Sequence, residues 1–146
     1  MAREIVDQLR RTAEAVFGPR PVALAYLHGS QASGHATPLS DVDVAIVTED
    51  PMPPRERLRL ELTLGTALAA VLGREVDVRV INHAPLAVWG KVVQTGVLLY
   101  ARDDAVRVNF ETAVRSAYFD FLPVLRYHRT AYFASQRALL TERGMP

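Results

Sequence analysis

The sequence of 146 residues contains no cysteine and only one lysine, Lys91. Without cysteine, the chain can form neither a disulfide bond nor a metal site made of thiolates. It also has almost no net charge, since 17 basic residues stand against 16 acidic ones. A balanced charge gives no reason to expect direct binding to nucleic acid or to a membrane surface, and we expect neither.

Long hydrophobic runs are missing as well. The longest apolar stretch, residues 62–73, is too short to span a bilayer. Arg3, Glu4 and Asp7 interrupt any apolar segment near the start, so no signal peptide is expected. With 49% apolar and 23% charged residues, the composition is typical of a globular protein. We therefore expect a single cytoplasmic domain over residues 1–146.

The spacing of apolar residues, together with glycine and proline, predicts alternating helices and strands. In the order α-β-β-α-β-α-β-α, they cover residues 5–17, 22–27, 42–48, 54–73, 75–81, 85–96, 97–100 and 104–143. Pro123 is expected to kink or divide the last helix. For the helix after residue 54, we expect an inward-facing set made up of Leu58, Leu62, Thr63, Ala67, Ala70 and Val71.

A Gly-Ser pair ends the first predicted strand, and two acidic residues open the second. Asp41 and Asp43 are two positions apart, so in a strand they point to the same face. Two neighbouring carboxylates repel each other unless a cation lies between them. Gly29 and Ser30 offer backbone N–H groups and a hydroxyl to an anion. The pattern predicts a metal-dependent site for a polyphosphate.

Asp77 is the natural third carboxylate of this site. It lies in the middle of a strand between valines, where a single charge requires a reason. The alternative is an ion pair with Arg79, or a solvated face of the strand. For Gly29 and Ser30 the alternative is a plain strand end and a helix cap, which use the same backbone N–H groups as a phosphate site.

These residues resemble a known family. Gly29-Ser30, ten further residues and then Asp41-x-Asp43, with Asp77 on a later strand, look like the minimal nucleotidyltransferase (MNT) branch of the polymerase-β-type superfamily. The resemblance implies an α/β (α+β) nucleotidyltransferase fold: a mixed β-sheet with helices packed on one side and a C-terminal helical extension. The catalytic core would span about residues 20–82, and the helical region about residues 104–143.

The whole chain is also similar to MNT proteins encoded beside HEPN-domain toxins. In that branch, Asp41, Asp43 and Asp77 would be catalytic and hold two Mg²⁺ ions, while Gly29 and Ser30 position the phosphates of ATP. The resemblance then implies transfer of AMP to a tyrosine hydroxyl of a HEPN ribonuclease toxin. The chain would be the antitoxin of that partner and form a hetero-oligomer with it.

One departure from the family pattern concerns the phosphates. Many relatives carry basic residues directly after Gly-Ser and two positions later, where this chain has Gln31 and Ser33. Another cation must then assist the triphosphate, and the sequence offers Arg79, Lys91 and Arg102 without ranking them.

Two other functions compete with adenylyl transfer to a toxin. The chain could neutralise its partner by binding alone, because the last helix has more aromatic residues than one core-facing stripe needs. It could also transfer a nucleotide to a small molecule, although relatives of that kind are usually longer and hold the acceptor with a second domain.

Overall fold

The structure is a computed structural model that describes residues 2–29, 32 and 41–142. Its helices and strands follow the predicted order closely. They are α1 (Ala2–Phe17), β1 (Val22–His28), β2 (Val42–Thr48), α3 (Pro54–Leu72), β3 (Val76–Val80), α4 (Leu86–Thr95), β4 (Val97–Ala101) and α5 (Asp104–Glu142). Proline and glycine mark several boundaries as expected. Gly73, for example, ends α3 in the left-handed conformation with φ 67°.

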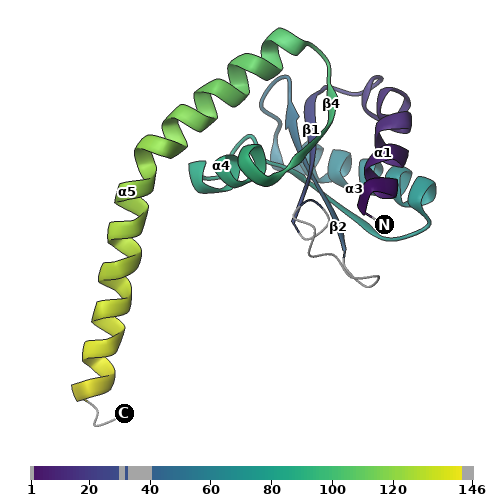
Figure 1. Cartoon of the computed structure of the whole chain (residues 1–146). Coiled ribbons are helices and arrows are strands. Elements are labelled where there is room, and N and C mark those ends of the chain that lie inside the picture. Colours follow the sequence, from purple (N-terminus) through teal and green to yellow (C-terminus); the bar gives the residue numbers. More distant parts are fainter. Residues whose placement is uncertain (1, 30–31, 33–40, 143–146) are drawn as a thin grey trace.

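The strands form a mixed sheet in the order β3-β2-β1-β4. The central strand β1 runs antiparallel to both β2 and β4, whereas β2 and β3 are parallel. Figure 1 shows the sheet between two groups of helices. The mixed sheet that the family resemblance implied is therefore confirmed.

Each face of the sheet carries its own apolar core. On one face, α1 and α3 pack over a core that includes Phe17, Leu27 and Leu64. The opposite face is covered by α4 and the first turns of α5, where the Trp89 and Phe110 rings lie 5.8 Å apart. Helices therefore cover both faces of the sheet. The one-sided packing that the resemblance implied describes α1 and α3 only, and α4 and α5 form a layer on the other face.

The predicted inward face of α3 is wrong apart from Ala67, which is partly buried and packs against the core. Leu58 is 55% exposed and Leu62 is 63% exposed, whereas the buried positions are Leu60, Leu64 and Leu68, together with Gly65. Leucine occurs at every second position from 58 to 64, so two faces of the helix are equally apolar in sequence. Packing against α1 and β3, which the sequence pattern does not contain, selects between them.

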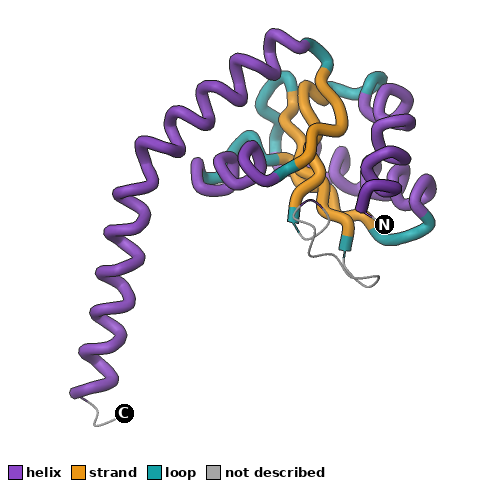
Figure 2. The backbone as a smooth tube through the Cα atoms, in the orientation of Figure 1, coloured by secondary structure: helices purple, strands orange, loops and turns teal. Residues whose placement is uncertain are grey.

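The last helix, α5, is continuous over 39 residues and has Pro123 inside it. Its axis changes direction partway along, and its outer part extends away from every other element (Figures 1 and 2). Of the two alternatives expected at Pro123, division is wrong because the helix is continuous, whereas a kink agrees with the bend in Figure 1. Within the part of the chain that the structure describes, no helix combines the length and apolar character needed to cross a membrane.

Two contacts hold the N-terminal part of α5 in place. The buried Glu111 accepts a hydrogen bond from the hydroxyl of Tyr26 in β1 at 2.9 Å, and it also pairs with Arg107 at 3.1 Å. Gly90 in α4 lies directly against the ring of Tyr118 in α5, so closely that a methyl group there would overlap the ring. These contacts fix where α4 and α5 lie over the sheet.

Candidate active site

Three polar side chains form one row across the sheet. The strand register pairs His28 of β1 with Asp43 of β2, and Asp43 with Asp77 of β3. Paired positions on neighbouring strands point to the same face, so the three side chains are neighbours there. We call His28, Asp43 and Asp77 the cross-strand row. It lies where β1 ends and where β2 and β3 begin, on the face that also carries Tyr26 and the second core.

Gly29 follows the row and has a left-handed backbone with φ 76°. A Cβ atom at this position would lie 2.9 Å from Oδ2 of Asp43, so the carboxylate rests directly over the glycine backbone. A residue with a side chain would be strained here and would displace the carboxylate. Gly29 is thus placed beside Asp43, as the metal-and-phosphate hypothesis requires. The other predicted phosphate ligand, Ser30, lies outside the described residues.

The carboxylates of the site influence one another. The pKa of Asp43 is raised, first by burial and then by the negative charges of Asp77 and Asp41, while His28 and Arg79 act in the opposite direction. Asp41, two residues earlier, is exposed just ahead of β2. Excess negative charge therefore gathers around Asp43, and a cation bound there would relieve it.

His28 does not supply that positive charge. Burial lowers its pKa from 6.5, and the neighbouring carboxylates of Asp43 and Asp77 only partly offset this effect. At neutral pH the imidazole is uncharged. From the sequence alone His28 is left out of the site, because a histidine next to a turn more often serves packing or a structural hydrogen bond. Its place in the row depends on the register between β1 and β2, which local sequence does not specify.

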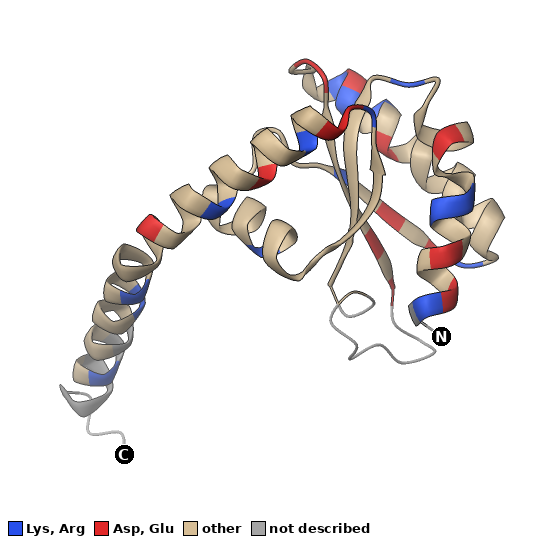
Figure 3. Cartoon of the chain, turned by 45° about the horizontal axis from the view of Figure 1, so that its top comes forward, with Lys and Arg blue, Asp and Glu red and all other residues tan. Residues whose placement is uncertain are grey.

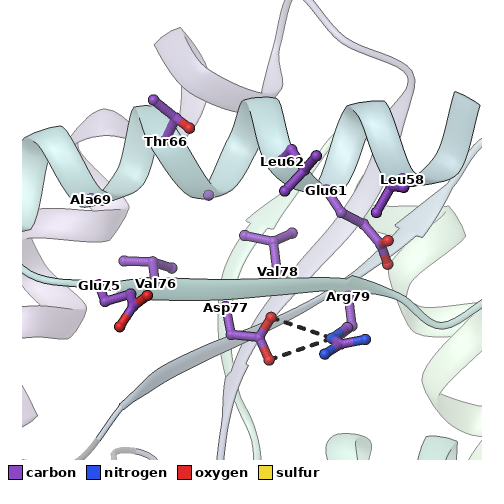
Figure 4. Close-up of a pocket in the computed structure, with 11 residues that line it drawn as sticks. Leu58, Glu61, Leu62, Thr66, Ala69, Glu75, Val76, Asp77, Val78 and Arg79 are labelled. Carbon is purple, nitrogen blue, oxygen red and sulfur yellow. Dashed lines mark hydrogen bonds and ion pairs between the residues drawn. The ribbon is translucent and has the colours of Figure 1, made fainter.

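Asp77 forms an ion pair with Arg79, whose Nε lies 3.2 Å from Oδ1 (Figure 4). The sequence analysis gave this pair as the structural alternative to metal binding. Both side chains are more than half exposed, so the pair is weak and the carboxylate is free to exchange its partner. Asp77 also lines a pocket of about 350 Å³ between α3 and the edge strand β3, next to the exposed Leu58 and Leu62.

The family resemblance implies Mg²⁺, and the fit of the residues can be tested. Among the described residues, no three histidine, aspartate or glutamate side chains converge closely enough to enclose a metal ion. Mg²⁺ does not need such a cage, because it is usually held by one or two carboxylates together with substrate phosphates and water. Asp41 and Asp43, with the charge excess around Asp43, fit this requirement, and Asp77 stands beside them.

A second pocket opens on the other side of the row. It has a volume of about 540 Å³ and lies between the end of β1 and α4. Its described lining consists of His28, Gly29, Ala87, Val88, Lys91, Val92 and Thr95. We call it the α4 pocket. It shares His28 and Gly29 with the carboxylate site, so a ligand in it would lie beside the glycine that contacts Asp43.

The comparisons with known proteins agree with this geometry. Residues 13–105 match the family described as polymerase beta, nucleotidyltransferase. The match spans more than half of the chain and contains the whole cross-strand row, Asp41 and Gly29. The protein therefore belongs to this family and is a nucleotidyltransferase. No curated protein sequence matches it.

Several solved structures share the fold. One is a toxin–antitoxin complex with AMP-PNP, at 22% identity and a TM-score of 0.63, covering 88% of this chain and 98% of the other. Another is the MntA–HepT toxin–antitoxin, at 20% identity and a TM-score of 0.61, with coverages of 90% and 98%. A third is a tri-AMPylated Shewanella oneidensis HEPN toxin in complex with MNT antitoxin, at 21% identity and a TM-score of 0.59, with coverages of 94% and 99%. The likeness confirms the MNT fold, including its C-terminal helical extension.

Proposed function

We propose that this nucleotidyltransferase transfers AMP from ATP to a tyrosine hydroxyl of a HEPN ribonuclease toxin and thereby acts as its antitoxin in the cytoplasm. The observation that carries the proposal is the pairing of Asp43 with Asp77 on adjacent strands, with the Asp43 carboxylate lying over Gly29. Support for the substrates comes from structures of the same fold, which include a complex with AMP-PNP and an AMPylated HEPN toxin.

In this proposal, Asp41 and Asp43 hold Mg²⁺, and the backbone around Gly29 and Ser30 receives the phosphates of ATP. The metal would neutralise charge on the phosphates and stabilise the charge that develops in the transition state. Asp77 lies on the side of the edge strand β3, away from the α4 pocket. We propose that it orients an acceptor that approaches from that side and takes up the acceptor's proton.

The reaction requires no covalent bond between the protein and the nucleotide. The acceptor oxygen attacks the α-phosphorus of ATP, and a new O–P bond forms. The bond between the α-phosphorus and the bridging oxygen to the β-phosphorus breaks, so pyrophosphate leaves. The hydroxyl proton passes to Asp77 and then to solvent. Catalysis depends on holding the two reactants in line and on electrostatic stabilisation.

The direct test is the intact mass of a HEPN-domain protein encoded beside this chain, after incubation with this protein, ATP and Mg²⁺. We expect mass increments of one or more adenylates, located on tyrosine by peptide mapping. Asp43→Asn should abolish the increments while the protein stays folded. Asp7→Asn, which changes an exposed carboxylate on α1, is the matched control and should transfer normally. An unmodified partner with folded wild-type protein would refute the proposal.

A second candidate function is neutralisation by binding alone, and the exposed aromatic residues of α5 favour it. Phe119 is 73% exposed and Tyr127 is 71% exposed. Aromatic side chains of this kind are common anchors of protein interfaces. The double variant Asp41→Asn, Asp43→Asn separates the two functions. If it still protects RNA fully from the HEPN partner, binding is sufficient; if protection is lost while the complex forms, transfer is required.

A further inference from the structure

The nucleotide site has a shortage of positive charge close to its phosphate-binding end. The eleven residues between Gly29 and Asp41 include neither lysine nor arginine. The negative charges of a bound triphosphate are stabilised by charged donors such as lysine and arginine, so in this chain such a side chain must come from another segment. The sequence analysis left Arg79, Lys91 and Arg102 open, and the structure separates them.

Arg102 lies at the end of β1 opposite to Gly29. Its guanidinium donates hydrogen bonds to the backbone carbonyls of Val22 at 3.1 Å and Gly18 at 2.9 Å, and it pairs with Glu49 at 2.6 Å. Val22 is the first residue of β1, whereas Gly29 follows its last. Arg79 lies on the β3 side of the cross-strand row, where it lines the pocket next to Asp77, and it is not among the residues that line the α4 pocket.

Lys91 is the one lysine or arginine among the described residues that line the α4 pocket. It is exposed, and it shares the pocket with Gly29, the glycine that touches Asp43. The rest of the wall supplied by α4 is small or apolar, namely Ala87, Val88, Val92 and Thr95. An anion in this pocket would therefore find one permanent positive charge, on the wall opposite the end of β1.

The end of α4 is also arranged to tolerate an anion. Carbonyl groups at a helix C-terminus are partly negative and would repel phosphate. Here the hydroxyl of Thr95 donates to the carbonyl of Lys91 at 2.7 Å, and the N–H of Gly96 donates to the carbonyl of Val92 at 2.8 Å. The carbonyls of Lys91 and Val92, two residues that line the pocket, are therefore already hydrogen-bonded.

We infer that Lys91 binds the β- and γ-phosphates of the nucleotide from the α4 pocket. The inference rests on the proposed function in taking ATP as the donor. During transfer, negative charge grows on the pyrophosphate as the bond to the α-phosphorus breaks. The ammonium group of Lys91 keeps its proton and stabilises this charge on the leaving group. Lys91 thus supplies the positive charge that the neutral residues Gln31 and Ser33 do not provide.

Because Lys91 is the only lysine, one spectroscopic probe reports on it alone. Reductive methylation with ¹³C-formaldehyde converts the whole folded protein to a form with two labelled amines, Lys91 and the chain's α-amino group, and it keeps both charges. With Mg²⁺ present, ATP and inorganic tripolyphosphate should each shift the Lys91 methyl resonance in a saturable way. AMP should leave it nearly unchanged, because it lacks the β- and γ-phosphates. The α-amino resonance is the internal control.

Kinetic measurements on unmodified protein give the second readout. In Lys91→Met, the KM for ATP in adenylyl transfer should rise by about tenfold or more, the factor that loss of one charge-assisted contact implies. Lys91→Arg keeps the charge and should stay within about threefold of wild type. Gln94→Ala, on an exposed part of α4 outside the pocket lining, should behave like wild type. All three variants should keep the wild-type Tm, since both positions are exposed.

The two readouts separate this inference from the proposed function. If polyphosphate shifts the Lys91 resonance but no AMP reaches the HEPN partner, Lys91 binds phosphate and the transfer proposal fails. If wild-type protein transfers AMP, yet Lys91→Met has an unchanged KM and ATP leaves the resonance in place, the assignment of Lys91 is overturned. A resonance that responds equally to AMP and ATP would also overturn it, because Lys91 would then lie beside the nucleoside.

Discussion

At the scale of single residues, Gly29 controls where the Asp43 carboxylate lies. Its left-handed backbone and its contact with Oδ2 of Asp43 are separate constraints. Gly29→Ala should lose roughly 1–2 kcal/mol of stability from the left-handed conformation. Its new methyl group should also push the carboxylate aside and lower the rate of nucleotidyl transfer by about tenfold or more, as displaced catalytic groups do. Thermal unfolding and transfer kinetics measure the two effects.

Gly73 provides the matched control for Gly29. Its φ of 67° is almost the same, but a Cβ atom there would have nothing within 4 Å. Gly73→Ala should therefore lose similar stability and keep full transfer activity. Equal activity in both alanine variants would show that Gly29 serves the turn alone and does not position Asp43.

Asp43 itself should destabilise the metal-free protein. Its pKa is raised from 3.8 in the folded chain by burial and by the neighbouring carboxylates, so the unfolded chain releases this proton at a lower pH. Ionising Asp43 therefore costs the folded state free energy as pH rises from the ordinary value through the raised one, and the cost persists at neutral pH. We expect Asp43→Asn to raise the Tm at pH 7 without divalent ions.

Added Mg²⁺ should reverse this order. The metal relieves the repulsion only where the carboxylates are intact, so Mg²⁺ should raise the Tm of the wild type and of the exposed control Asp7→Asn, but not that of Asp43→Asn. A wild-type Tm that does not respond to Mg²⁺ would contradict metal binding at Asp43.

At the scale of helices and strands, the sequence predicts the positions of the elements well and their faces less well. Strand β3 alternates valine with charged residues, so its buried side, with Val76 and Val78, follows from the pattern alone. Helix α3 has leucine on two faces, and only its neighbours determine that Leu60 is buried while Leu62 is exposed. Local sequence carries the first kind of information and not the second.

The contact between α4 and α5 also depends on neighbours that local sequence does not specify. It reverses the usual effect of replacing a glycine inside a helix by alanine. Alanine in place of a glycine inside a helix usually gains about 0.5–1 kcal/mol. At Gly90, however, the added Cβ would lie 2.1 Å from Cδ2 of Tyr118. Gly90→Ala should therefore destabilise the protein by about 1–3 kcal/mol in urea unfolding, the usual cost of overpacking.

A double-mutant cycle tests the cause of that loss. With the ring removed in Tyr118→Ala, adding Gly90→Ala should be neutral or stabilising, because only the helix preference remains. If Gly90→Ala is equally harmful with and without the ring, the close packing of α4 on α5 is not its cause.

At the scale of the whole molecule, the site is made by register and by packing between distant segments. Asp43 and Asp77 could be assigned to one site from their strands, because each lies at or near the start of a strand. The neighbours His28 and Lys91 could not be placed, since one depends on the pairing of β1 with β2 and the other on where α4 lies over the sheet. The limits of the catalytic core, about residues 20–82, stay a prediction.

The outer end of α5 is the other whole-molecule feature, and its chemistry indicates its partner. From residue 126 onward every side chain that the structure describes is exposed. Residues 126–142, which we call the arm, contain three arginines, Arg126, Arg129 and Arg137, against one acidic residue, Glu142. Figure 3 shows the basic bands along this part of the helix. A basic, aromatic arm fits an acidic protein surface better than a second copy of itself.

We therefore expect the arm, together with the part of α5 around Phe119, to carry part of the affinity for the HEPN partner. Phe119→Ser and Tyr127→Ser should each weaken the complex by about tenfold, as loss of an aromatic anchor does, with no change in Tm because both rings are exposed. Val71→Ser removes an exposed apolar side chain near the end of α3, outside the pocket that Asp77 lines, and should leave affinity unchanged. Calorimetric titration of the variants measures the contribution of the aromatic rings to affinity. A second titration at higher salt measures the contribution of the arginines, because salt screens their charge and affinity should fall. Unchanged affinity in both aromatic variants would place the partner's binding surface on the sheet and its helices, away from the arm.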